Sequence, residues 1–298
     1  MTSLYTHQAQ NVRKTWFIMF VFLVAVTAIG WGVSEYFGNP VILIVAVVFS
    51  LIMNVSSFWF SDKIAIKAAG AKPADASVYR DLHNTVENLA ITAGLPKPIL
   101  YIINDAAPNA FATGRNPENA AVAVTTGLLE ILNKTELEGV LAHELSHVGN
   151  RDILVMSVVV VLVGFIAILA DILWYATLFG GNRNRENSNP ALMIAGVALI
   201  VLGPVIAQIM QLAVSRKREF LADASGALLT RYPDALASAL QKISGYQSPM
   251  KKASSATAHM FISNPFGKNG KRGNTMRKLF STHPPVEERV QALVGMKV

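Results

Sequence analysis

Hydrophobic residues gather in four long runs along this chain instead of being spread through it. Residues 16–37 contain a single charged side chain, Glu35, and residues 40–60 contain none. About 20 apolar residues are enough for a helix to cross the hydrocarbon core of a bilayer. Gly38, Asn39 and Pro40 separate the two runs, and Gly and Pro interrupt helices. The pattern predicts an N-terminal membrane hairpin of two spanning helices.

Two further apolar runs lie in the middle of the chain. Residues 153–178 carry one charge, Asp171, and residues 190–214 carry none, with a polar, turn-rich segment at 180–189 between them. These runs predict a second helical hairpin, which gives four apolar helices in all. A carboxylate at membrane depth is costly unless it faces protein or water. Burial of this pair in protein, or partial insertion, therefore stays open as an alternative.

The polar segments 1–15, 61–152 and 215–298 would all lie on one side of the membrane. They hold every one of the 26 lysines and arginines except Arg183 and Arg185. Positive residues near the ends of spans favour the cytoplasmic side. The pattern therefore predicts a multi-pass protein whose soluble part is cytoplasmic, with residues 61–152 and 215–298 folding together as one domain interrupted by residues 153–214. Residues 1–60 form the first membrane hairpin in this division.

The first soluble segment reads as a small α+β unit. An amphipathic pattern over 79–93, closed by Gly94, predicts a helix, and 99–103 and 120–125 predict strands. Turn-forming residues at 114–119 would let 109–113 pair with 120–125 as a hairpin. A second helix is expected over 135–150, with Thr135 as its cap and Glu138 three residues later.

Composition narrows the function classes. The 298 residues are 52% hydrophobic and 15% charged, whereas soluble domains carry about 25% charge. Cysteine is absent, which excludes disulfides, thiolate metal sites and a cysteine nucleophile. The net charge of +7 fits a positive cytoplasmic face, and the basic stretch 267–278 could meet lipid head groups. The lipid bilayer is thus an expected partner and nucleic acid is not.

The predicted helix 135–150 contains His143-Glu144-Leu145-Ser146-His147, an H-E-x-x-H pattern. Residues four apart share a helical face, so two imidazoles can converge on one ion. Glu144 would then lie beside the reacting water, as a general base that later protonates the leaving amine. The competing explanation is a solvated helix face with a His–Glu pair. Zinc fits a site of His and carboxylate ligands.

A third ligand is required, and Glu219 is the candidate. Glu219 and Asp223 are four residues apart on an expected helix, so one can bind the metal while the other accepts the spare N–H of a ligand histidine. The small residues Ala222, Ala224 and Gly226 would allow this helix to pack closely against the histidine helix. Spacing alone leaves an equal alternative, in which Glu219 neutralises neighbouring arginines on a solvated face.

Several motifs in fixed order resemble the HtpX-type membrane heat-shock zinc metalloproteases, a family related to the CAAX prenyl endopeptidases. The resemblance covers nearly the whole chain. It rests on the two N-terminal spans and on the segments 109–114, 140–147, 218–223 and 282–285 with Arg289. It implies that His143, His147 and Glu219 bind one zinc ion, that Glu144 is the general base, and that the cytoplasmic domain is a gluzincin-like α+β fold. It also implies an endoprotease of the bacterial inner membrane that cuts unfolded or misfolded proteins in quality control and stress response.

Two further sites follow from the chemistry of peptide hydrolysis. An oxyanion develops beside the metal, and His283 and Arg289, which match the family's C-terminal pair, are the candidates to stabilise it. An ion pair of Arg289 with Glu287 or Glu288 is the alternative. Asn109, Ala110 and Phe111 are the candidate substrate-binding residues, because this edge could take up an extended substrate strand through main-chain hydrogen bonds. Strand 120–125 is expected to share that edge.

Two other classes compete with this interpretation. An intramembrane site-two-type protease also uses H-E-x-x-H, but it places the motif inside a span and takes a membrane Asp as third ligand, for which Asp171 is available. Here the motif precedes the apolar run. A non-enzymatic membrane scaffold would need no metal-binding triad, so bound zinc distinguishes it from the protease.

Overall fold

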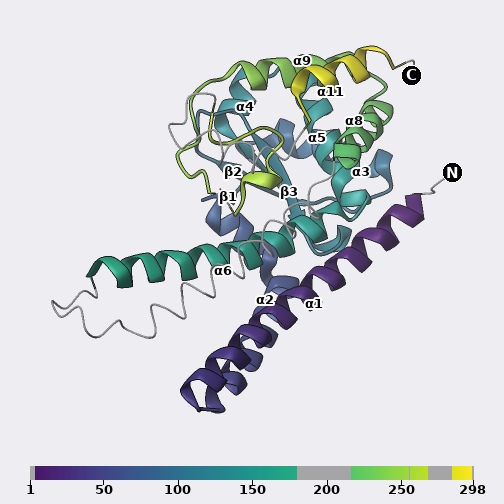
Figure 1. Cartoon of the computed structure of the whole chain (residues 1–298). Coiled ribbons are helices and arrows are strands. Elements are labelled where there is room, and N and C mark those ends of the chain that lie inside the picture. The colour runs from purple at the N-terminus through teal and green to yellow at the C-terminus, as the bar shows by residue number, and fades with distance from the viewer. Residues whose placement is uncertain (1–3, 180–215, 255, 268–283, 297–298) are drawn as a thin grey trace.

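The computed structural model describes residues 4–179, 216–254, 256–267 and 284–296 (Figure 1). For residues 4–6 and 167–179 it describes the backbone but not the side chains. Its helices and 3-10 turns (η) are α1 (Leu4–Phe37), α2 (Val41–Ala68), α3 (Arg80–Ala93), η1 (Pro117–Asn119), α4 (Thr126–Ile131), α5 (Lys134–Gly149), α6 (Asp152–Phe179), α8 (Arg216–Thr230), α9 (Pro233–Gly245), η2 (Ala258–Met260) and α11 (Val286–Val294). The strands are β1 (Lys72–Pro73), β2 (Ile99–Ile103), β3 (Ala110–Gly114) and β4 (Ala120–Thr125).

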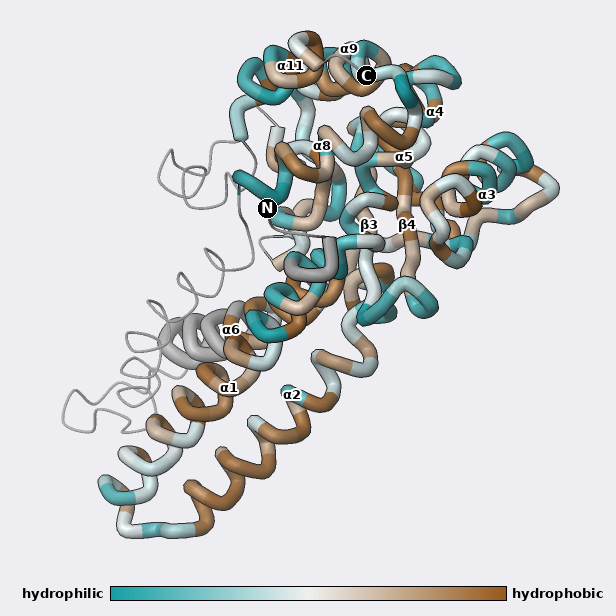
Figure 2. The backbone as a smooth tube through the Cα atoms, turned by 90° about the vertical axis from the view of Figure 1, so that its right-hand side faces the viewer, coloured by the Kyte–Doolittle hydropathy of each residue, from teal (hydrophilic) through white to brown (hydrophobic). Residues whose placement is uncertain are grey.

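The N-terminal hairpin is confirmed. Helices α1 and α2 run side by side away from the rest of the molecule, and Figure 2 shows their outer parts as largely apolar. The turn lies at residues 38–40, where Gly38 has a φ of 62° and Asn39 accepts a hydrogen bond from the backbone N–H of Val41. In the described part of the chain, α1 and α2 are long and apolar enough to cross a membrane.

Exposed aromatic side chains lie at both ends of this hairpin. Trp16 and Trp59 are about half exposed at one end, where Trp16 also stacks on Phe58, and Trp31 and Tyr36 are exposed at the other. Residues 16 and 36 are 20 positions apart, about 30 Å along a helix, which is the thickness of the hydrocarbon core. Aromatic belts at this spacing are typical of the two membrane interfaces.

The third apolar run forms one helix, α6, but its first half is enclosed by protein. Val155, Val158 and Leu162 are fully buried, in a cluster that includes Ile18 and Phe22 of α1. Helices α5 and α6 meet at a bend of 84°. The described residues contain a third membrane crossing only if this bent pair is counted as one broken span. Of the four expected apolar helices, the structure therefore shows the first pair as membrane-capable. Residues 190–214 lie outside the described residues.

The small sheet has the order β1-β2-β4-β3 and is mixed. Strand β4 pairs parallel with β2 and antiparallel with β3, which confirms the predicted hairpin of 109–113 with 120–125. One expectation is wrong. Strand β4 lies between two others, so its main chain is already paired and the edge belongs to β3 alone.

Alternate residues of β3 and β4 supply two different cores, as a period of two requires. Ala112 and Val122 face a cluster that also contains Val140 of α5 and Leu240 of α9. Phe111 and Ala123 face the opposite cluster, which contains Ile66 at the end of α2. The first cluster draws on both soluble segments of the chain. The sheet is thus held between the metal-site helices and the end of the membrane hairpin.

The start of helix α5 differs from the sequence expectation. Asn133, not Thr135, is the cap: its side chain accepts the backbone N–H of Glu136, and the Glu136 carboxylate accepts the backbone N–H of Asn133, both at 2.9 Å. This reciprocal pair is a capping box two residues earlier in the sequence than the predicted Thr135 and Glu138. Glu136 also accepts Ser238 and Lys242 of α9, so the same carboxylate joins the two helices. Helix α3, closed by Gly94 in the left-handed region, is as predicted.

Candidate metal centre

Helices α5 and α8 bring three metal-ligating side chains together. His143 and His147 lie one turn apart on α5, with their Nε2 atoms 3.2 Å from each other. Glu219 of α8 places a carboxylate oxygen 3.9 Å from His143 Nε2 and another 3.8 Å from His147 Nε2. All three residues are buried, and their ligand atoms lie within 4.8 Å of one another. Glu219 is therefore not on a solvated face.

A carboxylate lies behind each imidazole. Asp223, one turn after Glu219, is 2.9 Å from His143 Nδ1, as the spacing of the two acids predicted. Asp152, the first residue of α6, is 3.0 Å from His147 Nδ1. Both contacts favour the tautomer with the proton on Nδ1, which leaves the Nε2 lone pair of each ring directed toward the other ring and Glu219.

Arg289 completes the first of these two arrangements. It is 1% exposed, and its Nε and Nη2 donate to the two carboxylate oxygens of Asp223 at 2.7 and 2.6 Å. Its Nη1 lies 3.9 Å from Glu219. The described partner of Arg289 is thus a buried residue of α8, not Glu287 or Glu288, and helix α11 is tied through it to the metal centre. His283 lies outside the described residues.

Asp152 is a residue of the candidate metal centre that the sequence did not predict. Its second oxygen accepts Asn11 Nδ2 of α1 at 2.8 Å, and Asn11 also donates to the carbonyl of Asn150. Arg218 approaches the same oxygen at 3.5 Å. The available signal was an acid five residues after His147, just beyond the end of the helix. The contribution of α1 had no sequence signal, because residue 11 is about 140 positions away from its partners.

The pKa values of the two histidines are shifted in opposite directions. Burial disfavours the imidazolium form, but Asp152, Glu219 and Glu144 outweigh burial and raise the pKa of His147 to about 9. At His143 burial prevails over Asp223 and lowers the pKa. Burial would raise the pKa of Asp223, yet the hydrogen bonds and charge of Arg289 hold it below its usual value. The carboxylates around His147 therefore stabilise a positive charge at this position.

The donor set fits a zinc ion. Two imidazole nitrogens 3.2 Å apart beside a carboxylate need a positive charge between them, which either a proton or a metal ion supplies. Tetrahedral zinc, with ligands at about 2.0–2.1 Å, keeps its ligand atoms about 3.3 Å apart. The two histidine nitrogens, 3.2 Å apart, are close to that value, and each has an oxygen of the Glu219 carboxylate within 3.9 Å. Three protein ligands also leave one position for substrate or water, as catalytic zinc sites require.

Glu144 follows the first ligand directly in sequence and is 1% exposed. Its charge contributes to the raised pKa of His147, which places its carboxylate in the electrostatic field of the ligands. A buried carboxylate beside a metal site is a suitable proton acceptor. The third donor of the described cluster, Glu219, lies on α8, which is not among the membrane-capable helices. This arrangement differs from the intramembrane alternative, which required Asp171 of α6.

Close packing of α8 on α5 depends on Gly226. A Cβ at this position would lie 2.9 Å from the backbone N and 3.1 Å from the Cα of His143. The expectation that small residues allow a close approach is confirmed at Gly226 and at the fully buried Ala222, whereas Ala224 is only half buried.

Replacing Gly226 by Ala should therefore push α8 away from α5 and move Glu219 relative to His143. Overpacking of this kind costs about 1–3 kcal/mol. We expect a lower unfolding midpoint together with weaker zinc binding, measured by competition with a chromogenic chelator. Gly245→Ala is the matched control, because its added Cβ meets no atom within 4 Å. Equal zinc affinity in the two variants would contradict the assignment of the α5–α8 contact.

Asp152→Asn tests the carboxylate behind His147. The amide oxygen can still accept the Nδ1 proton, but the negative charge is lost and the imidazole becomes a poorer ligand. Loss of such a partner typically costs 10–100-fold in metal affinity or activity. We expect a zinc dissociation constant higher by about that factor, while Asp234→Asn, an exposed acid on α9, leaves it unchanged. An unchanged constant for Asp152→Asn would show that Asp152 only caps α6.

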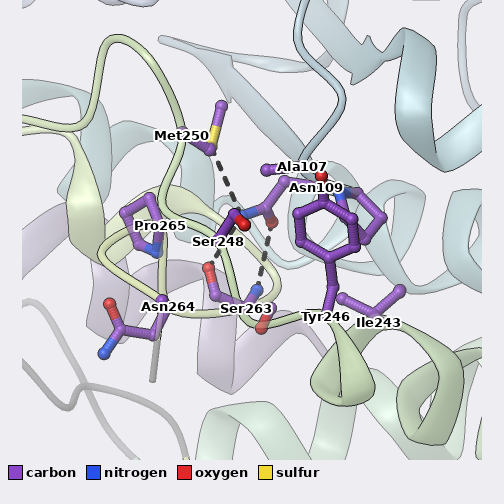
Figure 3. Close-up of a pocket in the computed structure, with 11 residues that line it drawn as sticks. Ala107, Asn109, Ile243, Tyr246, Ser248, Met250, Ser263, Asn264 and Pro265 are labelled. Atoms are coloured by element: carbon purple, nitrogen blue, oxygen red, sulfur yellow. Dashed lines mark hydrogen bonds between the residues drawn. The ribbon is translucent and has the colours of Figure 1, made fainter. Parts of the chain in front are cut away.

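The candidate substrate residues at β3 are buried and already have partners. The Asn109 side chain donates to the carbonyl of Ser263 at 2.9 Å and accepts its backbone N–H at 3.2 Å (Figure 3). The carbonyl of Ala110 accepts the backbone N–H of Ile262. Phe111 packs edge to face on Phe261, with ring centroids 5.0 Å apart. The first residues of this edge are thus covered by the segment 261–263.

Comparison with known proteins agrees with this geometry. The profile of "Peptidase family M48" matches residues 76–297. Two proteins described as "Protease HtpX homolog" are similar: that of Caldanaerobacter subterraneus subsp. tengcongensis is 45% identical, with 99% of both chains covered, and that of Thermoanaerobacter pseudethanolicus is 46% identical, with 99% and 98% covered. The crystal structure of S. mikatae Ste24p has a similar fold, with a TM-score of 0.50 and 18% identity over 93% of this chain, which spans 62% of the length of Ste24p.

Proposed function

Because this chain belongs to peptidase family M48 and is a membrane-bound zinc metalloprotease of the HtpX type, we propose that it hydrolyses peptide bonds of misfolded or unassembled proteins at the buried His143–His147–Glu219 centre. The observation that carries the assignment of the site is the convergence of these three donors, with Asp223 and Asp152 behind the two imidazoles. Quality control of membrane and cytoplasmic proteins is the role that this chemistry would serve.

Held by His143, His147 and Glu219, zinc would supply Lewis acidity toward the peptide carbonyl and the attacking water. Glu144 accepts the proton of the attacking water and delivers it to the leaving amine. Asp223 and Asp152 keep the two imidazoles in the ligating tautomer. We also propose Arg289 and His283 for stabilising the developing oxyanion. Support for Arg289 is its guanidinium, which lies beside Glu219.

Substrates would be read as extended chains at the edge of β3. In an antiparallel pair, alternate residues direct their N–H and C=O groups outward. Thr125 donates to the carbonyl of Asn109, so the outward positions of β3 are Ala110, Ala112 and Gly114. The Ala110 carbonyl accepts the N–H of Ile262, and the Gly114 N–H donates to Ser157 Oγ, which leaves Ala112 as the main-chain contact that we propose for substrate. Main-chain pairing is largely blind to sequence, which suits unfolded segments.

Placement in the bacterial inner membrane, with the catalytic part on the cytoplasmic side, is likewise a proposal. It is supported by the two apolar helices and by the lysines and arginines near their ends, among them Arg13, Lys14 and Lys63. We propose the division into a membrane hairpin (1–60), a catalytic domain in two parts (61–152 and 215–298) and an inserted apolar hairpin (153–214).

The test uses the full-length protein in lipid nanodiscs and two forms of one substrate, a stably folded protein and a destabilised variant of it. We expect cleavage of the unfolded form with zinc, loss of cleavage with a chelator, and recovery when zinc is restored, while the folded form persists. Equal cleavage of both forms would overturn the quality-control role. Chelator-resistant cleavage would overturn the metal site itself.

A further inference from the structure

A cavity of about 180 Å³, lined by several charged and polar side chains, lies beside the metal centre but outside it. Three segments that are distant in sequence enclose it: the first turns of α1, the turn between α5 and α6, and the start of α8. Its lining includes His7, Gln10, Lys14, Lys217 and Arg218. The mechanism proposed above uses none of these side chains.

The cavity is positively charged. Lys14 and Arg218 are half buried and Lys217 is exposed, so three cations converge on one space. Among the described residues that line it, the one carboxylate is Asp152, which is 2% exposed and already accepts Asn11 and contacts His147. Two positive charges thus remain in excess. Lysine and arginine clusters of this kind hold phosphate groups through charge-assisted hydrogen bonds.

The position of the cavity along α1 identifies the source of the anion. Lys14 comes two residues, or about 3 Å of helical rise, before Trp16, whose exposed ring belongs to the aromatic belt at this end of the hairpin. Phosphates of a bilayer lie just outside such a belt. Basic pockets between membrane helices at the cytoplasmic surface are suited to lipid head groups.

We propose that this cavity binds the phosphate of an anionic phospholipid through Lys14, Lys217 and Arg218. Gln10 lines the same cavity and offers a neutral hydrogen-bond donor. The site is separate from the zinc ligands, and the proposal does not depend on which substrates the protease cuts. It depends only on the membrane hairpin that places Lys14 at the head-group level.

The test is native mass spectrometry of the zinc-loaded, full-length protein released from nanodiscs that contain phosphatidylglycerol and phosphatidylcholine. We expect one phosphatidylglycerol to stay bound after detergent washing. Lys14→Gln/Lys217→Gln should weaken its retention at least tenfold. The matched control is Arg13→Gln/Arg216→Gln, which removes two exposed charges next in sequence on the same two helices and should retain the lipid.

Three results would overturn the assignment of a phospholipid site. Equal retention in both double variants overturns the proposal, as does equal retention of phosphatidylcholine. Lipid-free protein in neutral detergent is also titrated with inorganic phosphate. If millimolar phosphate displaces the phospholipid, the site is one for a soluble anion and the lipid assignment is wrong. Zinc content reports on folding. Should the double variant lose zinc, Lys217→Gln alone, at an exposed position, decides by the same measurement.

Discussion

Replacing Glu144 by Gln is expected to lower hydrolysis of an unfolded polypeptide by about 10²–10⁴-fold while zinc stays bound. Glutamine has nearly the same shape but cannot accept a proton at neutral pH, and His143, His147 and Glu219 are unchanged. The measurement pairs a rate of peptide-bond cleavage with the zinc content of the same sample. If the variant binds zinc but does not cleave peptides, Glu144 is the proton acceptor and not a metal ligand.

A matched substitution on the same helix guards against a general effect of lost charge. Glu138 is half buried on α5, and it lies six residues before Glu144, on a different face from the ligands. Glu138→Gln should keep both zinc and activity. Full activity of Glu144→Gln would remove Glu144 from the mechanism, and loss of zinc in that variant would mean that Glu144 holds the metal instead.

Replacing Glu219 by Gln is expected to abolish both metal binding and cleavage. A neutral amide is a poor zinc ligand, and the two imidazoles alone cannot complete the site. The loss of affinity should exceed that of Asp223→Asn, which acts one contact away and for which about 10–100-fold is expected. The measurement is the zinc dissociation constant of each variant, determined by competition with a chelator.

Glu288→Gln, an exposed acid on α11, is the control for Glu219 and should bind zinc normally. If Glu219→Gln retained zinc at the same affinity, the carboxylate would instead serve mainly to balance Arg289, whose Nη1 lies 3.9 Å away. The relative effects of Glu219→Gln and Asp223→Asn therefore distinguish a ligand from an ion-pair partner.

The sequence predicted those parts of the protein that depend on local periodicity. The membrane hairpin, strands β2 and β4 and the histidine helix follow from apolar runs, turn residues and the spacing of four between His143 and His147. The Glu219–Asp223 pair could be proposed for the same reason, since both lie on one face of one helix. Here each signal is contained within a few turns of chain.

What the sequence did not predict depends on contacts between distant segments. Asn11 reaches Asp152 across 141 positions, and Arg289 reaches Asp223 across 66. Neither pair leaves a local pattern, because polar side chains at these positions are equally compatible with solvent. The cap of α5 was misplaced for a different reason: Thr135 and Glu138 satisfy the same rule as Asn133 and Glu136, and only the backbone at Asn133 distinguishes them.

The bond between α1 and the turn after α5 has a consequence for where this activity can exist. Gln8 and Asn11 hold the carbonyls of Gly149 and Asn150, and the first turns of α6 are covered by Ile18 and Phe22. A fragment shed by cleavage after the hairpin would lose these contacts and expose an apolar helix at the same moment. We expect such a fragment to aggregate or lose its metal. Cleavage between the hairpin and the catalytic part would therefore release an inactive fragment, so the protease would be active only while it is anchored in the membrane.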